Sequence, residues 1–304
     1  MNSQELANTI WALATLQVNH HQLINLIATE SIQKISQFNS QNLANTIWAL
    51  ATLQVNHPQL INLIATESIQ KISKFNSQNL ANTIWALATL KLNHPPLIDT
   101  IFQESIQKIS QFNSQALANT IWALATLQVS HPQLINLIAT ESIQKISQFN
   151  SQDLANTIWA LATLKVNHPQ LIDTISQESI QKISQFKCQE LANTIWALAT
   201  LQVSHPQLIN LIATESIKKI SQFNSQELAN TIWALATLQV NHHQLINLIA
   251  TESIQKISQF NSQNLANTIW ALATLQVNHP QLINLIATES IQKISKFNSQ
   301  NLAN

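Results

Sequence analysis

The chain has 304 residues, of which 45% are hydrophobic and only 9% are charged, and its 14 lysines balance its 14 acidic residues. A chain this apolar and weakly charged can bury a continuous core, which excludes an intrinsically disordered protein. The absence of glycine excludes the glycine-rich loops with which P-loop and dinucleotide-binding proteins hold phosphate.

Tryptophan recurs every 37 residues from Trp11 to Trp270, and histidine keeps the same interval from His20 to His279. A constant period of about 20 to 50 residues is typical of stacked-repeat proteins, in which no repeat buries its apolar face alone. We therefore predict a single all-α domain over residues 1–304, folded as a right-handed α-solenoid superhelix of helix-turn-helix repeats. Eight full repeats begin near residues 3, 40, 77, 114, 151, 188, 225 and 262, and a partial ninth begins near 299. Because this ninth repeat stops without a polar capping repeat, we expect the chain to be a fragment of a longer protein.

The first repeat, residues 3–39, predicts two helices. The first helix is expected to begin after Ser3 as its N-cap and to end near Val18. Its apolar residues recur at helical spacing and form a wide stripe that includes Trp11, which predicts that the tryptophan is buried. The second helix follows His20, and in six of the eight copies a proline such as Pro58 opens it, where the missing N–H costs nothing.

Each second helix places a glutamate four residues before a lysine, as in Glu30 and Lys34. This order suits a solvent-exposed ion pair on a helix, so the first interpretation is a solvated face. The alternative is that the lysines contact phosphates, since each repeat places one cation on the same face. Neutral net charge and the absence of arginine weaken this alternative.

The other chemically reactive residues do not indicate catalysis. The histidines are 37 residues apart without a second ligand at metal-binding spacing, so a turn-capping or packing role is expected and no metal or other cofactor is implied. No nucleophile, base and acid are specified beyond what repetition imposes, so we expect neither an enzyme nor a small-molecule substrate. The single cysteine, Cys188, and the absence of a signal peptide or membrane span predict an intracellular, reducing compartment, either an organelle or a bacterial cytoplasm or effector setting.

One face of the first helix is neither charged nor strongly apolar. We name each repeat position by its residue in the first repeat; the Glu5, Asn8, Ala12 and Thr15 columns recur at steps of three and four residues and should share a face. The Glu5 column alone holds four residue types, and its variation does not follow the other differences between repeats. The candidate nucleic-acid-binding residues are the members of the Glu5 and Asn8 columns. The Glu5 column comprises Glu5, Asn42, Asn79, Ala116, Asp153, Glu190, Glu227 and Asn264, with Asn301 in the partial repeat, and the Asn8 column comprises Asn8, Asn45, Asn82, Asn119, Asn156, Asn193, Asn230 and Asn267. The alternative for the variable column is an exposed helix start, where acidic residues suit the dipole.

The segment Ser-Gln-Asn-Leu-Ala-Asn-Thr-Ile-Trp-Ala-Leu-Ala-Thr-Leu at 40–53 resembles the first helix of octotricopeptide repeats, and also a related bacterial repeat of 37 residues. The resemblance covers essentially the whole chain. It implies paired antiparallel helices that bind single-stranded RNA at about one nucleotide per repeat, in post-transcriptional gene regulation. Two features depart from the family: the repeat has 37 residues rather than 38, and the second helix begins His-Pro-Gln-Leu instead of a proline-rich stretch ending in tryptophan.

A peptide-binding or protein-binding solenoid is the alternative. Armadillo-type proteins hold an extended peptide with an asparagine ladder and exposed tryptophans, and the Asn8 column forms such a ladder in principle. A peptide-binding groove requires Trp11 to be exposed, whereas an octotricopeptide-like RNA binder is expected to bury it. A designed scaffold without a ligand would not carry scattered substitutions such as Phe102, Lys187 and Cys188.

Overall fold

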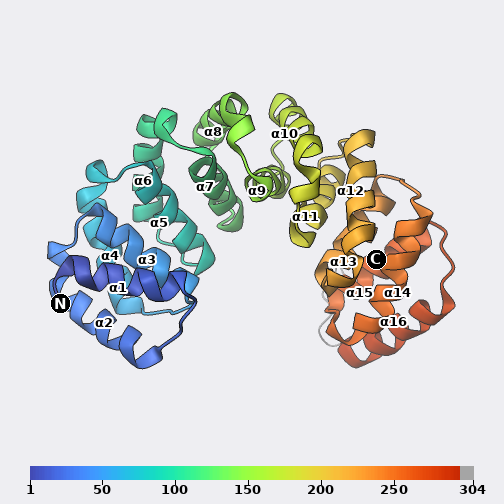
Figure 1. The fold of residues 1–304 in the computed structure, drawn as a ribbon, viewed down its shortest axis with the longest axis horizontal. Helices are drawn as coiled ribbons and strands as arrows, with labels where there is room; N and C mark the ends of the chain where they lie inside the picture. Colours follow the sequence, from blue (N-terminus) through green and yellow to red (C-terminus); the bar gives the residue numbers. More distant parts are fainter. Residues whose placement is uncertain (295–304) are drawn as a thin grey trace. The chain divides into compact units, whose positions relative to one another are not determined.

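The computed structural model describes residues 1–294, and within this range it contains sixteen α-helices and no β-strand (Figure 1). The prediction of two helices per repeat in an all-α solenoid is therefore confirmed, while the partial ninth repeat and Asn301 lie outside the described residues. The first helices of the eight repeats are α1 (Ser3–Thr15), α3 (Ser40–Thr52), α5 (Ser77–Thr89), α7 (Ser114–Thr126), α9 (Ser151–Thr163), α11 (Cys188–Thr200), α13 (Ser225–Thr237) and α15 (Ser262–Thr274). The second helices are α2 (His21–Lys34), α4 (Pro58–Lys71), α6 (Pro95–Lys108), α8 (Pro132–Lys145), α10 (Pro169–Lys182), α12 (Pro206–Lys219), α14 (His243–Lys256) and α16 (Pro280–Lys293).

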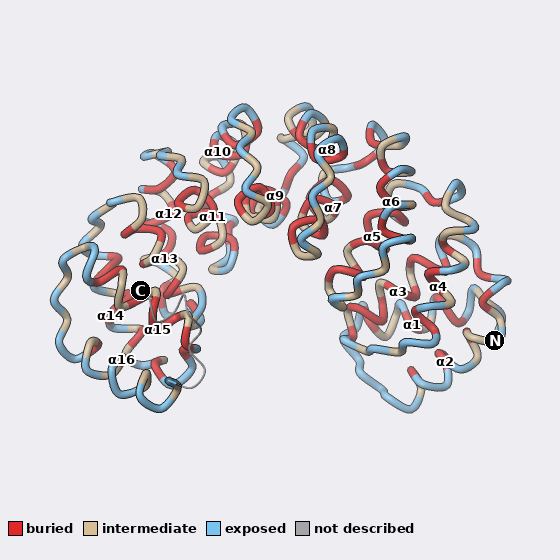
Figure 2. The backbone as a smooth tube through the Cα atoms, turned by 180° about the vertical axis from the view of Figure 1, so that it is seen from behind, coloured by how far each residue is buried: buried red, intermediate tan, exposed pale blue. Residues whose placement is uncertain are grey.

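The repeats form two compact bodies of four repeats each. The N-terminal body comprises Met1–Gln148, and the C-terminal body begins at Phe149. Within each body the first helices pack side by side in one layer, and the second helices form the other layer, as α2, α4, α6 and α8 do in the N-terminal body. Buried backbone positions are concentrated in the first-helix layer, whereas the second helices expose long stretches (Figure 2).

Small side chains bring the first helices close together. The Ala12 column is fully buried from Ala49 onward, and Ala44, Ala81 and their equivalents are also buried between neighbouring first helices. Alanine lets two helix backbones approach closely, so these helices contact one another over more of their length than the second helices do. The bulkier isoleucines and Phe38-type side chains fill the space between the two layers.

The first helices begin one residue earlier than the sequence pattern predicts. Asn2, rather than Ser3, is the N-cap: its side-chain oxygen accepts a hydrogen bond from the backbone N–H of Glu5 at 2.9 Å. Asparagine at this position satisfies a backbone donor that would otherwise lack a partner at the helix start. The sixth repeat has Lys187 instead, whose side chain has no acceptor, and this helix start lacks the asparagine bond.

Each first helix ends in a Schellman motif without glycine. Gln17 adopts a φ of 55°, its N–H bonds the Ala14 carbonyl, and the Val18 N–H bonds the Leu13 carbonyl. Gln or Lys occupies this left-handed position in every repeat, although glycine would adopt the conformation more easily. The motif stops the helix and directs the chain toward the second layer.

The histidines cap the second helices, which confirms the expected turn-capping role. The Nδ1 atom of His20 accepts a hydrogen bond from the backbone N–H of Leu23, and six further histidines do the same at 3.2–3.4 Å. His205 is the exception, since its Nδ1 is buried without a hydrogen-bond partner. Proline follows the histidine in six repeats and occupies the start of the helix, as predicted.

The lysines of the second helices connect neighbouring repeats. Each pairs with the glutamate four residues earlier, as predicted, at 2.5–3.8 Å. From Lys71 to Lys293, each ammonium also donates to the carbonyl of the Phe38-type residue in the preceding repeat at 2.5–2.8 Å. The expectation of a solvated face is therefore wrong, because these side chains are only 20–24% exposed beyond the first repeat. The lysines stabilise the stack and are not presented to phosphates.

Replacing one of these lysines should weaken the interface between two repeats. Lys145→Met removes the donor to the Ser110 and Phe112 carbonyls, both at 2.8 Å, and leaves Glu141 without its partner. Hydrogen bonds from a charged group contribute about 1.5–3 kcal/mol, so we expect the free energy of unfolding in urea to fall by about that amount. The control is Lys74→Gln, at an exposed position where most other repeats have glutamine, and it should change the unfolding midpoint little. Equal effects of both substitutions would contradict the role of Lys145.

The missing cap at the sixth repeat can be restored. Lys187→Asn recreates the side-chain acceptor that the other seven first helices use. We expect the free energy of unfolding to rise by about 1 kcal/mol, the usual contribution of an N-cap. Chemical denaturation of wild type and variant measures it, and Asn224→Lys in the next repeat should produce the opposite change.

Candidate nucleic-acid interface

The first-helix layer of the C-terminal body bounds an open groove of about 770 Å³. Four columns line it, at steps of four, three and four residues along one face of each helix. The lining residues are Gln226 and Gln263, Asn193, Asn230 and Asn267, Trp159, Trp196, Trp233 and Trp270, and Thr163, Thr200 and Thr237. The groove is therefore a repeated strip of amides, indole rings and threonines.

The tryptophans form a ladder on this surface. The ring centroids of Trp196, Trp233 and Trp270 are separated by 6.5 and 6.4 Å, with planes tilted by 35°. In the N-terminal body, Trp48, Trp85 and Trp122 have the same 6.4 Å spacing. The prediction that the tryptophans are buried is wrong: they are half-buried, and Trp11 is 44% exposed. Alanines and Leu6-type residues of the same helix fill the interior instead, which leaves the indoles on the outer face of the layer.

The Asn8 column lies where the sequence predicted, on the open face of the first helices. Asn8 is exposed, and Asn45, Asn82, Asn119, Asn156, Asn193, Asn230 and Asn267 are half-buried. Asn267 accepts a hydrogen bond from the side-chain amide of Gln263, one turn earlier, at 2.7 Å. The groove thus contains coupled amides that both donate and accept. In the N-terminal body, Asn45 and Asn82 line a smaller hollow of about 240 Å³ together with Trp11 and with Asn79 of the variable Glu5 column.

The variable Glu5 column has a structural position. Asn42, Asn79, Ala116, Asp153, Glu190 and Asn264 are 4–7% exposed, so the expectation of an exposed column is wrong; Glu5 is exposed and Glu227 half-buried. The column is the third residue of each helix, and five members accept a hydrogen bond from the backbone N–H of the capping residue at 2.7–3.3 Å: Glu5, Asn79, Asp153, Glu190 and Glu227. Reciprocal capping tolerates Asp, Glu or Asn, which explains much of the variation. The Ala12 column is also interior, so in the C-terminal body only the Asn8 and Thr15 columns of the expected strip line the groove.

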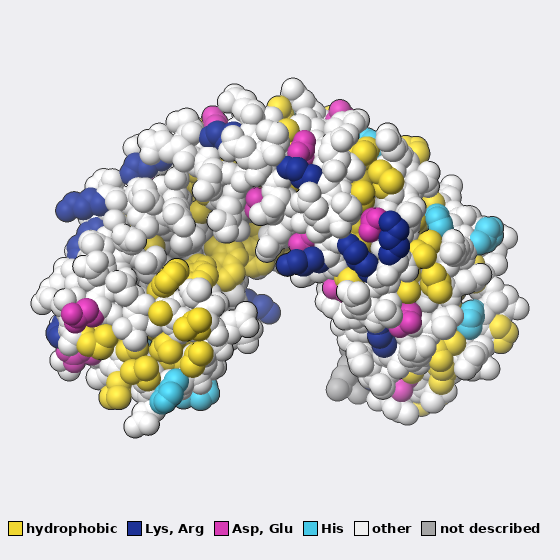
Figure 3. Space-filling view, viewed as in Figure 1, with side chains coloured by type: hydrophobic (Ala, Val, Ile, Leu, Met, Phe, Trp, Pro, Cys, Tyr) yellow, Lys and Arg dark blue, Asp and Glu magenta, His cyan; other side chains and the backbone are white. Residues whose placement is uncertain are grey.

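The groove carries no charge. None of the residues that line it is lysine, arginine, aspartate or glutamate. On the face drawn in Figure 3, lysines occur singly or in small groups, and several lie beside Asp or Glu side chains. The groove therefore offers a ligand aromatic rings, side-chain amides and threonines, and no ionic partner.

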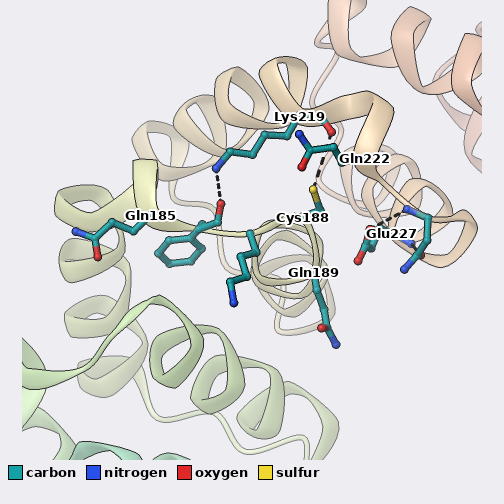
Figure 4. A pocket seen from close by; sticks show the side chains of 9 residues that line it. Gln185, Cys188, Gln189, Lys219, Gln222 and Glu227 are labelled. Carbon is teal, nitrogen blue, oxygen red and sulfur yellow. Dashed lines mark hydrogen bonds between the residues drawn. The ribbon is translucent and has the colours of Figure 1, made fainter. Parts of the chain in front are cut away.

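A second hollow of about 420 Å³ lies at the starts of α11 and α13 (Figure 4). The Cys188 thiol contacts the Lys219 carbonyl at 3.9 Å, and Glu227 lies across the hollow. Burial raises the pKa of the Cys188 thiol, and the negative charge of Glu227 raises it further. Desolvation also raises the pKa of Glu227, against the opposing Asn224 hydrogen bond and the charge of Lys256. A protonated, half-buried thiol is a poor nucleophile, so the hollow offers no reactive centre.

Two further findings concern the described residues as a whole. They include no cluster of three or more His, Cys, Asp or Glu side chains placed to hold a metal ion. Across residues 1–294, no helix combines the length and apolar character that crossing a membrane requires.

The fold and the groove define an α-solenoid repeat protein with one uncharged, ring-lined surface. The family model of the RNA-editing substrate-binding complex 6 proteins matches residues 1–206 and, in a second overlapping match, residues 145–304. The chain belongs to this family. The two matches overlap because the repeats resemble one another. No curated protein matches the chain in sequence.

Sequence reasoning missed two of the four groove columns, Gln4 and Trp11, and placed the Thr15 column on the open face without naming it as a binding column. Gln4, Trp11 and Thr15 lie on the same helical face as Asn8, and each is identical in all eight copies. The spacing of 4, 8, 11 and 15 was a usable signal. Tryptophan, however, also fits the apolar stripe, and the variation of the Glu5 column indicated a surface role for a position that is mostly buried.

Glu227 should make stability depend on pH. Because the pKa of Glu227 is raised in the folded state, folding favours the protonated carboxyl. The contribution of protonated Glu227 to stability is complete below the ordinary pKa of 4.5 and is lost as pH rises through the raised pKa. Glu227→Gln keeps an acceptor for the Asn224 N–H without the charge, so the variant should gain stability relative to wild type as pH rises from 4 to 7. Urea unfolding at several pH values measures this difference. Parallel pH profiles of the two proteins would contradict it.

Proposed function

We propose that this protein binds single-stranded RNA along the groove columns of its first helices, at about one nucleotide per repeat. The observation that carries the proposal is the ladder of indole rings and amides in a chain whose family is named after an RNA-editing substrate-binding complex. Single-stranded bases expose their faces and their hydrogen-bonding edges, and helical-repeat proteins address each base with two or three side chains.

The ring spacing supports one base per repeat. Adjacent ring centroids are 6.4–6.5 Å apart, about twice the roughly 3.4 Å rise between stacked bases. Bases and rings can alternate at this spacing with one nucleotide for each ring. Stacking of a base on an aromatic side chain contributes about 1–3 kcal/mol, so four rings in the C-terminal body provide a substantial binding energy.

The asparagines and glutamines supply the polar contacts. An amide can donate and accept at the same time, so it can pair with two adjacent atoms of a base edge. Gln263 and Asn267 already form such a donor–acceptor pair with each other. A base that enters the groove can replace this bond and form hydrogen bonds with both side-chain amides.

Peptide binding is the second candidate, and the partly exposed position of the tryptophans on the open face favours it. An uncharged groove with an asparagine ladder suits an extended peptide backbone, as in armadillo-type proteins. The family membership favours RNA over this alternative. The same groove serves both hypotheses, so direct binding measurements distinguish them.

The proposal includes three further expectations. The repeat is related to octotricopeptide repeats, the protein binds its ligand without acting as an enzyme, and it resides in a reducing intracellular compartment. The lone half-buried Cys188 fits a reducing compartment.

Removing one ring should weaken RNA binding selectively. We expect Trp233→Ala to reduce the affinity for single-stranded RNA by about 1–3 kcal/mol, measured by fluorescence anisotropy. Because the groove has no lysine, raising salt from about 50 to 200 mM should weaken wild-type binding by no more than about threefold, the effect of a single phosphate contact.

The control is Asp153→Asn, which exchanges one residue of the buried variable column for another that this column already contains. It should leave RNA affinity and base preference unchanged, whereas base reading by this column would alter the preference at one nucleotide. Circular dichroism verifies that both variants fold. If wild type binds no single-stranded RNA even at low salt, the proposal fails and the peptide hypothesis becomes the better one.

A further inference from the structure

The solvent-facing residues of the groove do not vary between repeats. The Gln4, Asn8, Trp11 and Thr15 columns each hold one residue type in all eight copies. The eleven residues from Leu6 to Leu16 are also identical throughout. Every complete repeat therefore presents the same chemical surface to a ligand.

The opposite layer of the same protein provides the comparison. The Gln22, Asn25, Thr29 and Gln33 columns are solvent-exposed on the second helices. Each of them varies between repeats, through substitutions at Pro96, Asp99, Gln103 and Lys218 among others. Both layers share one duplication history, so recent duplication alone does not explain why the groove columns are uniform while these exposed columns of the second helices vary.

A uniform surface cannot read a varied sequence. A helical-repeat protein distinguishes one base from another by changing the side chains that contact it. In the first helix only two columns vary: the Ser3 column, through Cys188 in the sixth repeat, and the Glu5 column, which lies mostly in the interior and caps the helix. Successive repeats must therefore prefer the same base.

We infer that the groove recognises a run of one base in single-stranded RNA, and that this base is adenine. The inference rests on the proposed function and specifies its substrate. An asparagine or glutamine amide pairs with the N6 and N7 atoms of adenine, one as donor and the other as acceptor. Guanine presents two acceptors at the corresponding edge and is paired by lysine or arginine, which the groove lacks. Pyrimidines have one ring instead of two and cover less of an indole, so the tryptophan ladder favours the purine.

The experiment measures the binding of RNAs of about four nucleotides, one for each repeat of one body, to the whole chain. Oligoadenylate should bind at least about tenfold more tightly than oligouridylate, oligocytidylate or a mixed sequence. A single uridine placed at each internal position of oligoadenylate in turn should weaken binding by about the same factor every time, because all repeats are alike.

A pair of matched variants tests the amide. Asn230→Asp removes the donor to adenine N7 and should weaken oligoadenylate binding by about tenfold. Asn247→Asp makes the same change of charge in the same repeat, at an exposed column of the second helix that already carries aspartate at Asp99 and Asp173, and should leave binding unchanged.

The outcomes separate this inference from the proposed function. Equal affinity for all RNAs would overturn the inference and leave RNA binding intact, with the ladder acting as a platform without sequence preference. Tightest binding to another homopolymer would overturn the assignment to adenine. Failure to bind any RNA would overturn the proposed function and the inference together.

Discussion

Close packing between neighbouring first helices determines the geometry of the groove. The buried alanines at 49, 86 and 123 leave little space between these helices, so each tryptophan lies beside the next at 6.4 Å. A larger side chain in the Ala12 column would separate the helices and the rings together. The spacing of the tryptophan rings is thus a consequence of interior packing, although the rings themselves lie on the surface.

The cations of this protein are mainly used to hold the stack together. Eight of the 14 lysines belong to the Lys34 column, and in the described structure they bind glutamates and backbone carbonyls. The end of each second helix and its following turn present carbonyls that a cation satisfies well. This arrangement leaves the groove neutral, which distinguishes it from nucleic-acid-binding surfaces that rely on phosphate contacts. Stacking and amide pairing are the interactions that remain available.

The capping column and the groove columns differ in how much they vary between repeats. The Glu5 column varies because aspartate, glutamate and asparagine can all accept the same backbone hydrogen bond, and alanine at 116 loses only part of the cap. The groove columns do not vary although solvent would tolerate many substitutes there. Surface positions usually vary more than buried ones. Here the mostly buried Glu5 column varies, whereas the groove columns on the open face are identical in all eight repeats.

The sequence by itself determined the repeat length, the two helices of each repeat, the proline starts and the Glu30–Lys34 pairing, because these depend on contacts within a few residues of one another. The capping role of His20 was also predictable, since the turn between two helices needs an acceptor for free N–H groups. The tertiary structure decided which faces of the first helix are buried. That helix is enclosed by a neighbour on either side and by the second layer, and a single helix's apolar stripe cannot reveal which narrow face is left open. For this reason Trp11 lies outside, Asn42 and Asp153 lie inside, and Lys71 binds the preceding repeat.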